Sequence, residues 1–338
     1  MGSTLRWGIM GTGNIARQFA AGLGAARRGT IQSIGSRSAD SARSFAAKFP
    51  GEAHGSYDAL LADRNVDAIY LSLPNSMHHE WTIKSLKAGK HVLCEKPIAS
   101  SAAQAEEMFD VAQKAGKVLV EAFMYRSHPQ TAKILETIKS GVIGQVKLIK
   151  TSFCYRTTKI EGNIRFSREL HGGAVMDVGC YCVNLSRLIA GGEPDRVLAA
   201  GKLFETGVDE WSGGTLHFPN GIIGSFVCGM TVQADNSAFI CGTDGYLQIG
   251  WPWKPQPQAT FTVAHSVPPR QDSSTSTAGT RPPREDITVE AGRELYAFEA
   301  DDFAATVLDG AAPALSRQDT VGNMRVLDQI RQQVGLQF

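Results

Sequence analysis

Hydrophobic positions in the first part of the chain form short apolar runs that alternate with amphipathic segments. Apolar runs over 5–10 and 67–74 predict strands, whereas apolar residues three or four positions apart over 14–27 and 102–115 predict helices. The connections between these segments are short. Strands that alternate with helices in this way predict a parallel, doubly wound sheet. We therefore expect an α/β domain over residues 1–125.

The pattern changes after this domain. Several β-rich runs follow over 196–250, and turn sequences such as Asp244-Gly245 separate them, which favours hairpins. Two helical segments follow near the C-terminus. We predict an α+β domain over 126–338, with a large, mostly antiparallel open sheet and C-terminal helices that pack back. Residues 252–290 are rich in Pro, Ser and Thr, which predicts a loop-rich excursion within this domain.

Composition narrows the class of protein. Lys and Arg number 34 and Asp and Glu 33, so a formal net charge of +1 leaves no electrostatic footprint for nucleic acid or an anionic membrane. No apolar run approaches the roughly 20 residues that a membrane span needs, and the N-terminus lacks a signal-peptide core. The six cysteines form no C-x-x-C pair, which predicts reduced packing residues and no metal site. These features favour a soluble, cytoplasmic protein.

A glycine-rich turn joins the first predicted strand to the first predicted helix. Gly11, Gly13 and Ala16 are spaced as G-x-G-x-x-A. The first glycine allows a tight turn, the second lets backbone N–H groups approach a pyrophosphate, and the small third residue allows close helix packing. This context predicts a dinucleotide site, and the predicted contacts are Gly11, Thr12, Gly13, Asn14 and Ile15.

The end of the second predicted strand bears on the choice of dinucleotide. NAD-selective sites place an acid there for the ribose 2′-hydroxyl, but this chain has Ser36 and Arg37. A guanidinium and a hydroxyl suit a 2′-phosphate, which favours NADP over NAD. The alternative is that Arg37 is a solvated surface residue and Asp40 contacts the ribose.

A lysine stands where a predicted core strand ends. Lys96 follows the apolar run over 91–94 and Glu95, and it precedes Pro97. Ligands of parallel sheets bind beyond the carboxyl ends of the strands, so Lys96 and Glu95 are expected beside the nicotinamide. The alternative is an exposed strand-end lysine that pairs with Glu95.

Several motifs resemble one known family. The segments "GIMGTGNIA", "PNSMHHEW", "AGKHVLCEKP", "AFMYRSHPQ" and "GGAVMDVGCYCVN" are similar to the Gfo/Idh/MocA family of NAD(P)-dependent oxidoreductases. The sequence around the last motif resembles the branch that contains glucose-fructose oxidoreductase, dimeric dihydrodiol dehydrogenase and NADP-dependent D-xylose dehydrogenase. The resemblance implies an N-terminal Rossmann domain. It also implies that family members associate through the C-terminal sheet, so a homodimer or tetramer is expected.

The resemblance also implies site residues. Lys96 maps onto the catalytic lysine of the E-K-P motif, Tyr181 onto the second acid/base residue of D-x-G-x-[HY], and Asp177 onto its first position. The P-N-x-x-H motif places His78 at the nicotinamide end of the site, and Leu73 and Asn75 are further predicted cofactor contacts. The predicted substrate contacts are Arg126, Asn163, Arg165, Asp177 and Tyr181. For Arg126 an interdomain salt bridge is the alternative, and for Tyr181 a core position in an apolar helix.

These residues predict an oxidoreductase that acts on a sugar or cyclic diol. A free phenol is a poor base at neutral pH, and we expect the Lys96 ammonium to lower the pKa of Tyr181 and make the pair a proton acceptor. The first choice of reaction is NADP-dependent oxidation of an aldose at C1 to the lactone. Two alternatives remain: an NAD-dependent glycoside hydrolase that uses transient oxidation, and a non-catalytic protein that senses NADP.

Overall fold

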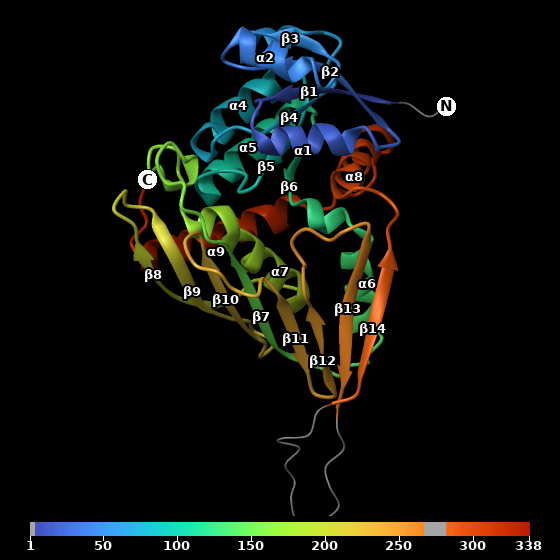
Figure 1. Ribbon diagram of the computed structural model, residues 1–338, viewed down its shortest axis with the longest axis vertical. Helices are drawn as coiled ribbons and strands as arrows, with labels where there is room; N and C mark the ends of the chain where they lie inside the picture. The colour runs from blue at the N-terminus through green and yellow to red at the C-terminus, as the bar shows by residue number, and fades with distance from the viewer. Residues whose placement is uncertain (1–3, 267–281) are drawn as a thin grey trace, which may run out of the picture.

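The computed structural model describes residues 4–266 and 282–338, which form two sheets with helices between and around them (Figure 1). The first sheet has six parallel strands in the order β3-β2-β1-β4-β5-β6. Its elements, in chain order, are β1 Leu5–Met10, α1 Asn14–Leu23, β2 Gly29–Gly35, α2 Ala39–Ala46, β3 Glu52–His54, α3 Tyr57–Ala62, β4 Ala68–Leu71, α4 Asn75–Lys87, β5 His91–Glu95, α5 Ala102–Ala115 and β6 Leu119–Ala122. This arrangement confirms the predicted doubly wound parallel sheet.

The middle of this sheet is its most buried part. Every residue of β4 is buried, as is nearly every residue of β1 and β5, as expected for central parallel strands that helices cover on both faces. The strand order reverses between β1 and β4, and ligands of such sheets bind at that switch point beyond the carboxyl ends. Helix α1 ends at Leu23, earlier than predicted, and Gly24 is its C-cap residue.

The second sheet has eight strands in the order β14-β13-β12-β11-β7-β10-β9-β8. All neighbouring pairs are antiparallel except β7 and β10, which are parallel. This confirms the predicted large, mostly antiparallel sheet. The strands are β7 Val146–Cys154, β8 Arg196–Leu203, β9 Asp209–His217, β10 Ile223–Gly229, β11 Ala238–Gly242, β12 Gly245–Ile249, β13 Gln258–His265 and β14 Arg284–Glu290.

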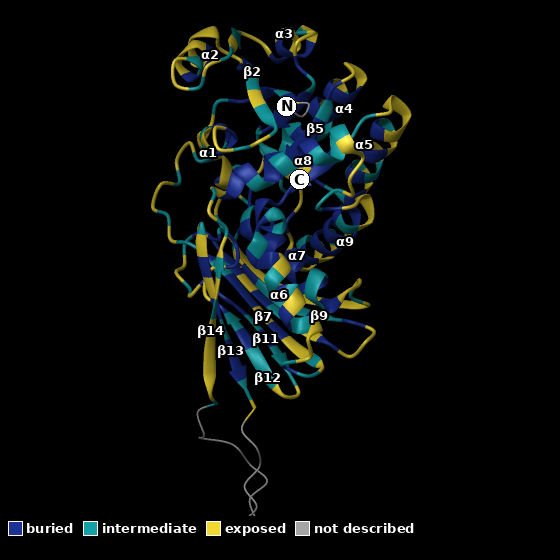
Figure 2. Ribbon diagram, turned by 90° about the vertical axis from the view of Figure 1, so that its right-hand side faces the viewer, coloured by how far each residue is buried: buried dark blue, intermediate teal, exposed yellow. Residues whose placement is uncertain are grey.

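The prediction of a loop-rich excursion over 252–290 is wrong for much of that segment. Strands β13 and β14 occupy 258–265 and 284–290 and form one edge of the second sheet. The edge strand β14 is mostly exposed (Figure 2) and its side chains are largely polar, so it lacks the apolar alternation of a half-buried strand. The rest of the predicted loop, 267–281, lies outside the described residues.

The remaining helices link the two sheets. They are α6 Pro129–Lys139, α7 Cys180–Ala190, α8 Leu295–Asp309 and α9 Arg317–Val334. Helix α7 covers β7 and β10, α9 contacts both α5 and β8, and α8 packs against α1 (Figure 1). The approach of α8 is close, because a Cβ at Gly22 of α1 would lie 2.4 Å from the Cβ of Tyr296. The C-terminal helices therefore cover the first domain.

All six cysteines are free thiols, as predicted. Within 4–266 and 282–338 there is no helix with the length and apolar character that crossing a bilayer requires.

Candidate active site

A cavity of about 490 Å³ lies at the carboxyl edge of the first sheet and is walled by residues of both domains. The wall from the first domain consists of Gly13, Asn14, Ile15, Gln18, Ser72, Leu73, Asn75, His78, Glu95 and Lys96. The wall from the rest of the chain consists of Met124, Phe153, Tyr155, Ile164, Arg165, Leu170, Gly172, Asp177, Val178, Tyr181, Trp251 and Lys254. The cavity thus lies where a doubly wound sheet is expected to bind its ligand.

Lys96 extends from the end of β5 into this cavity and meets Asp177. Its Nζ donates a hydrogen bond to the main-chain oxygen of Asp177 at 2.8 Å and lies 3.3 Å from Oδ1. Both side chains are 14% exposed, so the pair is largely shielded from solvent. Burial alone would lower the pKa of Lys96, but the Asp177 carboxylate raises it above the ordinary value. The ammonium form of Lys96 is therefore the stable form.

Asp177 organises the charges around it. Its Oδ2 accepts hydrogen bonds from the hydroxyl of Tyr155 at 2.7 Å and from Nε of Arg165 at 2.8 Å. Burial tends to raise the pKa of Asp177, but Lys96, Arg165 and these hydrogen bonds together hold it well below its usual range. A π-helical turn over Val175–Gly179 carries the residue, and such turns occur often at functional sites. The carboxylate therefore fixes two cations and one phenol.

Tyr181 lies one turn further along, at the start of α7. The Lys96 Nζ is 5.1 Å from the centre of its ring, so the two predicted acid/base residues do meet. The Tyr181 hydroxyl, however, donates to the sulfur of Met124 at 3.3 Å, and the residue is only 3% exposed. Burial, followed by repulsion from Glu95, raises the pKa of Tyr181 well above its ordinary value. The expectation that Lys96 lowers this pKa is therefore wrong for this structure.

The glycine turn fits a pyrophosphate. Gly11 has a φ of +102°, and a Cβ there would lie 3.0 Å from the main-chain oxygen of Ser72. A Cβ at Gly13 would meet no atom within 4 Å, so open space lies in front of this residue. Among the described residues no side chain caps helix α1, whose first N–H groups can thus bind an anion. Gly13, Asn14 and Ile15 line the cavity, whereas Gly11 and Thr12 are not among its lining residues.

The turn after β2 carries the residues predicted for a 2′-phosphate. Ser36 is buried and Arg37 is exposed. Arg37 forms no ion pair with any described residue. Asp40 is instead paired with Arg43 within helix α2. The arginine is thus available to an anion, while the nearest acid is already engaged.

The P-N-x-x-H motif braces the cofactor end of the cavity. His78 is 1% exposed, and its ring nitrogens lie 2.9 Å and 2.8 Å from the main-chain oxygens of Pro97 and Leu73. Burial lowers the pKa of His78, so the neutral ring is favoured. Asn75 donates from Nδ2 to the main-chain oxygen of His171 at 2.8 Å. These side chains tie together the loops that surround Lys96.

The carboxylate of Glu95 faces the hydroxyl of Tyr70 and does not pair with the ammonium of Lys96. One carboxylate oxygen accepts a hydrogen bond from the Tyr70 hydroxyl, and the other accepts from the main-chain N–H of Lys96 at 3.2 Å. Burial raises the pKa of Glu95. The alternative in which Lys96 is an exposed charge paired with Glu95 does not fit this geometry, because Asp177 is the partner.

Two predicted substrate contacts do not line the cavity. Arg126 forms an ion pair with Asp319 at 2.8 Å and donates to Asn184 Oδ1 at 3.1 Å. This salt bridge joins two residues of the segment 126–338, so it is not the interdomain salt bridge that the sequence left as the alternative. Asn163 accepts a hydrogen bond from the main-chain N–H of Arg165 and so caps the short helical turn that carries Arg165.

Sequence reasoning missed part of the cavity wall. Tyr155 follows β7 directly, and no motif in the sequence marks it as a site residue. Trp251 and Lys254 come from the segment between β12 and β13, where no spacing pattern marks them. Trp253 of the same segment is fully buried, whereas Trp251 is 44% exposed at the cavity.

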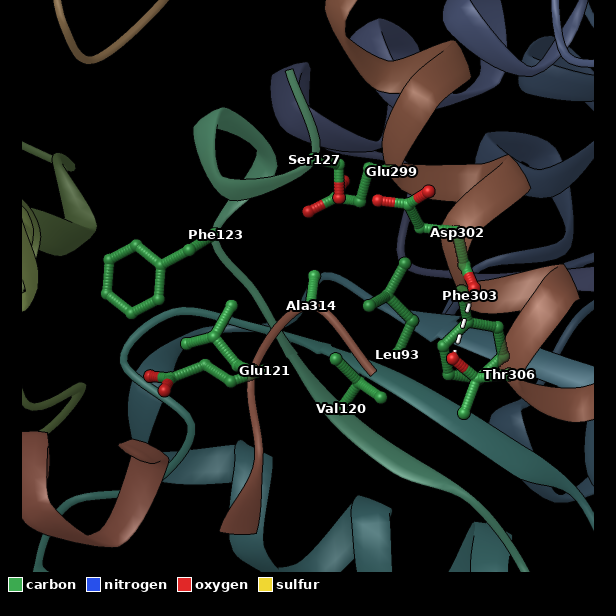
Figure 3. Close-up of a pocket in the computed structure, with 11 residues that line it drawn as sticks. Leu93, Val120, Glu121, Phe123, Ser127, Glu299, Asp302, Phe303, Thr306 and Ala314 are labelled. Carbon is green, nitrogen blue, oxygen red and sulfur yellow. Dashed lines mark hydrogen bonds between the residues drawn. The ribbon is translucent and has the colours of Figure 1, made fainter. Parts of the chain in front are cut away.

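A second, much smaller cavity of about 10 Å³ lies between α8 and β6 (Figure 3). Glu299 and Asp302 of α8 lie near Ser127 there, while the carboxylate of Glu121 points away from them. Oε1 of Glu121 accepts from the main-chain N–H of Ile98 at 2.9 Å, and Oε2 has no hydrogen-bond partner among the described residues. Burial raises the pKa of Glu121 to about 8. This space holds at most one water molecule and is separate from the Lys96 cavity.

Comparison with known proteins identifies the family. Residues 5–123 match the "Oxidoreductase family, NAD-binding Rossmann fold", and residues 131–248 match the "GFO/IDH/MocA C-terminal domain". The chain therefore belongs to the Gfo/Idh/MocA oxidoreductase family.

Individual relatives agree with the predicted branch of that family. A D-xylose 1-dehydrogenase (NADP(+)) of Haloferax volcanii is 34% identical over 331 residues, which cover 96% of each chain. A trans-1,2-dihydrobenzene-1,2-diol dehydrogenase of Mus musculus is 34% identical over 255 residues, covering 74% of this chain and 76% of the relative. Among solved structures, the 3-ketoreductase KijD10 of Actinomadura kijaniata, in complex with NADP and TDP-benzene, has a TM-score of 0.88 and 29% identity, with 98% of both chains covered.

Proposed function

We propose that the protein is an NADP-dependent oxidoreductase that transfers hydride between nicotinamide and a hydroxyl-bearing carbon of a sugar or cyclic diol. The preferred reaction is oxidation of an aldose at C1 to the lactone. One observation carries the proposal: the Lys96 ammonium, the Asp177 carboxylate and the Tyr181 ring share one cavity with an uncapped helix N-terminus. The names of the relatives support the sugar or diol class.

The chain supplies the proton chemistry. Bound NADP would supply the hydride acceptor for the carbinol carbon, and a side chain of the protein must take the proton of the hydroxyl on the same carbon. Lys96 is positioned by Asp177 to hold the substrate oxygen, and Tyr181 is the second proton carrier. Both groups are protonated at neutral pH, since their pKa values are raised. Oxidation needs one of them deprotonated, so its rate should rise with pH, whereas reduction uses the protonated pair.

The decisive measurement is absorbance at the reduced-nicotinamide band with a panel of aldoses and cyclic diols. We expect reduction of NADP with at least one aldose and formation of the lactone. Absence of any turnover with both cofactors across the panel would refute the proposed activity. Glycoside cleavage without net cofactor reduction would favour the hydrolase alternative instead.

The choice of NADP rests on the turn after β2. Arg37 has no ion-pair partner among the described residues, and the Haloferax relative is named for NADP. Replacing Arg37 with alanine should raise KM for NADP at least tenfold and leave KM for NAD nearly unchanged, because only NADP carries the 2′-phosphate. Asp40→Ala, which removes the neighbouring acid, is the control. An equal effect of Arg37→Ala on both cofactors would exclude the phosphate contact.

The outer face of the second sheet supports self-association. Helix α7 covers the inner face, but an apolar row on the outer face is exposed: Leu148, Leu198, Trp211, Ile223 and Val227. Leu148 and Ile223 are direct neighbours across β7 and β10. Exposed apolar side chains on one face of a sheet fit a contact with a second copy of the chain. We propose a homodimer or tetramer, which light scattering would test.

We also propose a cytoplasmic location, because free thiols suit a reducing compartment.

A further inference from the structure

The segment between β12 and β13 holds a lysine rigidly at the cavity. Trp253 is fully buried, donates from Nε1 to the main-chain oxygen of Ser152 at 2.9 Å, and stacks on Phe153 with ring centres 5.5 Å apart. This anchor fixes its neighbours Trp251 and Lys254, and both line the cavity. The packing of Trp253 therefore fixes the position of Lys254 at the cavity.

The charges of the cavity wall do not balance. Lys96, Arg165 and Lys254 are cationic, and only Glu95 and Asp177 can oppose them. Asp177 is shared by Lys96 and Arg165, while Glu95 is turned toward a buried tyrosine hydroxyl and its burial disfavours the charged form. Lys254 is left without an ion-pair or side-chain hydrogen-bond partner in the part of the chain that the structure describes.

The surroundings of Lys254 disfavour a bare ammonium. Burial lowers its pKa, and repulsion by Lys96 adds to this effect. An ammonium held under these conditions gains most from an anion that enters the cavity. Arg165 can assist, because only its Nε is engaged and its terminal nitrogens have no hydrogen-bond partner within the described ranges.

Arg165 and Lys254 come from a different domain than the predicted pyrophosphate site. The pyrophosphate of the cofactor has its own binding surface at the glycine turn and the N-terminus of α1. Arg165 and Lys254 both follow the first domain in the chain and line the cavity together with Lys96 and Asp177. The anion that they would bind is thus a group of the substrate.

We propose that the substrate is an anionic sugar or diol, and that Lys254, assisted by Arg165, binds its carboxylate or phosphate. This inference rests on the proposed function and specifies its substrate class. Lys254 is a specificity-determining residue in this view, because a neutral sugar leaves its ammonium without a partner. The shared chemistry is a small oxyanion on a pyranose, supplied either by an acid group on the ring or by a phosphate ester.

Matched sugars separate these cases. Glucose, glucuronate and glucose 6-phosphate share one ring and differ in the group at carbon 6. We expect kcat/KM for one of the two anionic sugars to exceed that for glucose at least tenfold, as for a charge-assisted contact, and to fall as ionic strength rises. The anionic sugar with the higher kcat/KM shows whether the site binds a carboxylate or a phosphate.

Two substitutions test the lysine itself. Lys254→Met should lower kcat/KM for the preferred anionic sugar at least tenfold and change the value for glucose less than threefold, whereas Lys254→Arg should retain most of the preference. Lys133→Met, at an exposed lysine of α6 that pairs with Glu136, is the matched control and should change neither value. Equal loss on anionic and neutral sugars, or a rise in KM for NADP alone, would overturn the assignment.

A binding measurement keeps the inference separate from the activity. Titration of the NADP-loaded protein with each sugar, followed by calorimetry, should give tighter binding of the anionic sugars to the wild type than to Lys254→Met. If neutral sugars react and no anionic sugar binds or reacts better, the anionic class is wrong and the proposed activity stands. If an anionic sugar binds through Lys254 but no sugar or diol is turned over, the binding site stands and the proposed activity fails.

Discussion

Replacing Asp177 with asparagine tests the arrangement on which the proposed chemistry depends. The substitution keeps the size of the side chain and one acceptor oxygen, but it removes the negative charge between Lys96 and Arg165. The hydroxyl of Tyr155 also loses a charged acceptor. Two cations then face each other across a largely buried site without a counterion.

The size of the effect follows from the distance and the burial. A charge pair 3.3 Å apart interacts by about 5 kcal/mol at an effective dielectric constant of about 20. Water that enters the cavity recovers part of this, so we expect the free energy of unfolding to fall by about 3 kcal/mol, the lower end for breaking a buried pair. The carboxylate is the main influence that raises the pKa of Lys96, so in the variant burial and Arg165 lower it.

The sign of the pH effect is the sharpest readout. Reduction requires the protonated lysine and is lost as pH rises through its pKa, and oxidation appears over the same range. Because Asp177→Asn lowers this pKa, the midpoint of the profile of kcat/KM against pH should move to lower pH in both directions of reaction. Urea unfolding measures the change in stability, and Glu136→Gln, in the exposed pair with Lys133, should cost less than about 1 kcal/mol.

An unchanged or alkaline-shifted midpoint in Asp177→Asn would refute the idea that this carboxylate holds Lys96 in its charged form. A shift to lower pH with unchanged stability would mean that water replaces the ion pair fully in the folded state. The Glu136→Gln control distinguishes these outcomes from a general effect of removing one acid.

Two further predictions concern single hydroxyl and carboxyl groups. Tyr181→Phe keeps the ring packing but removes the second proton carrier, so kcat should fall about 10²- to 10⁴-fold. We expect little change in KM for NADP or in the urea midpoint. An unchanged kcat would mean that Tyr181 is a core residue without a role in proton transfer. The pKa of Glu121 is raised from 4.5 to about 8, so the folded protein keeps this proton while the unfolded chain releases it, and wild-type stability should decline as pH rises from about 4.5 to about 8. Glu121→Gln is neutral throughout and should remove that part of the decline in urea midpoints, whereas an unaltered slope would contradict the assigned pKa.

The features that sequence predicted well are local ones. The glycine turn and the strand that ends just before Lys96 are each encoded within a few residues. Local patterns of this kind survive in the fold because the backbone enforces them.

The features that sequence missed depend on distant parts of the chain or on burial. Arg126 is occupied by Asp319, which lies on the last helix, and Lys254 reaches the cavity only because Trp253 anchors its segment beneath it. The sequence predicts a lowered pKa for Tyr181, because the motifs indicate a nearby ammonium. They do not indicate the burial of the ring, which raises this pKa in the structure. Strand β14 was missed because an exposed edge strand lacks apolar alternation.

The close approach of α8 to α1 has a consequence for how the molecule is made. Asp301 of α8 accepts hydrogen bonds from the main-chain N–H groups of Arg27 and Arg28, so the connection between α1 and β2 is held by a segment that is synthesised much later. Because synthesis proceeds from the N-terminus, one flank of α1 stays uncovered until α8 has been made. A fragment that ends after β6 would therefore expose the surface of α1 that α8 covers. We expect such a fragment to aggregate rather than to fold as an autonomous cofactor-binding unit.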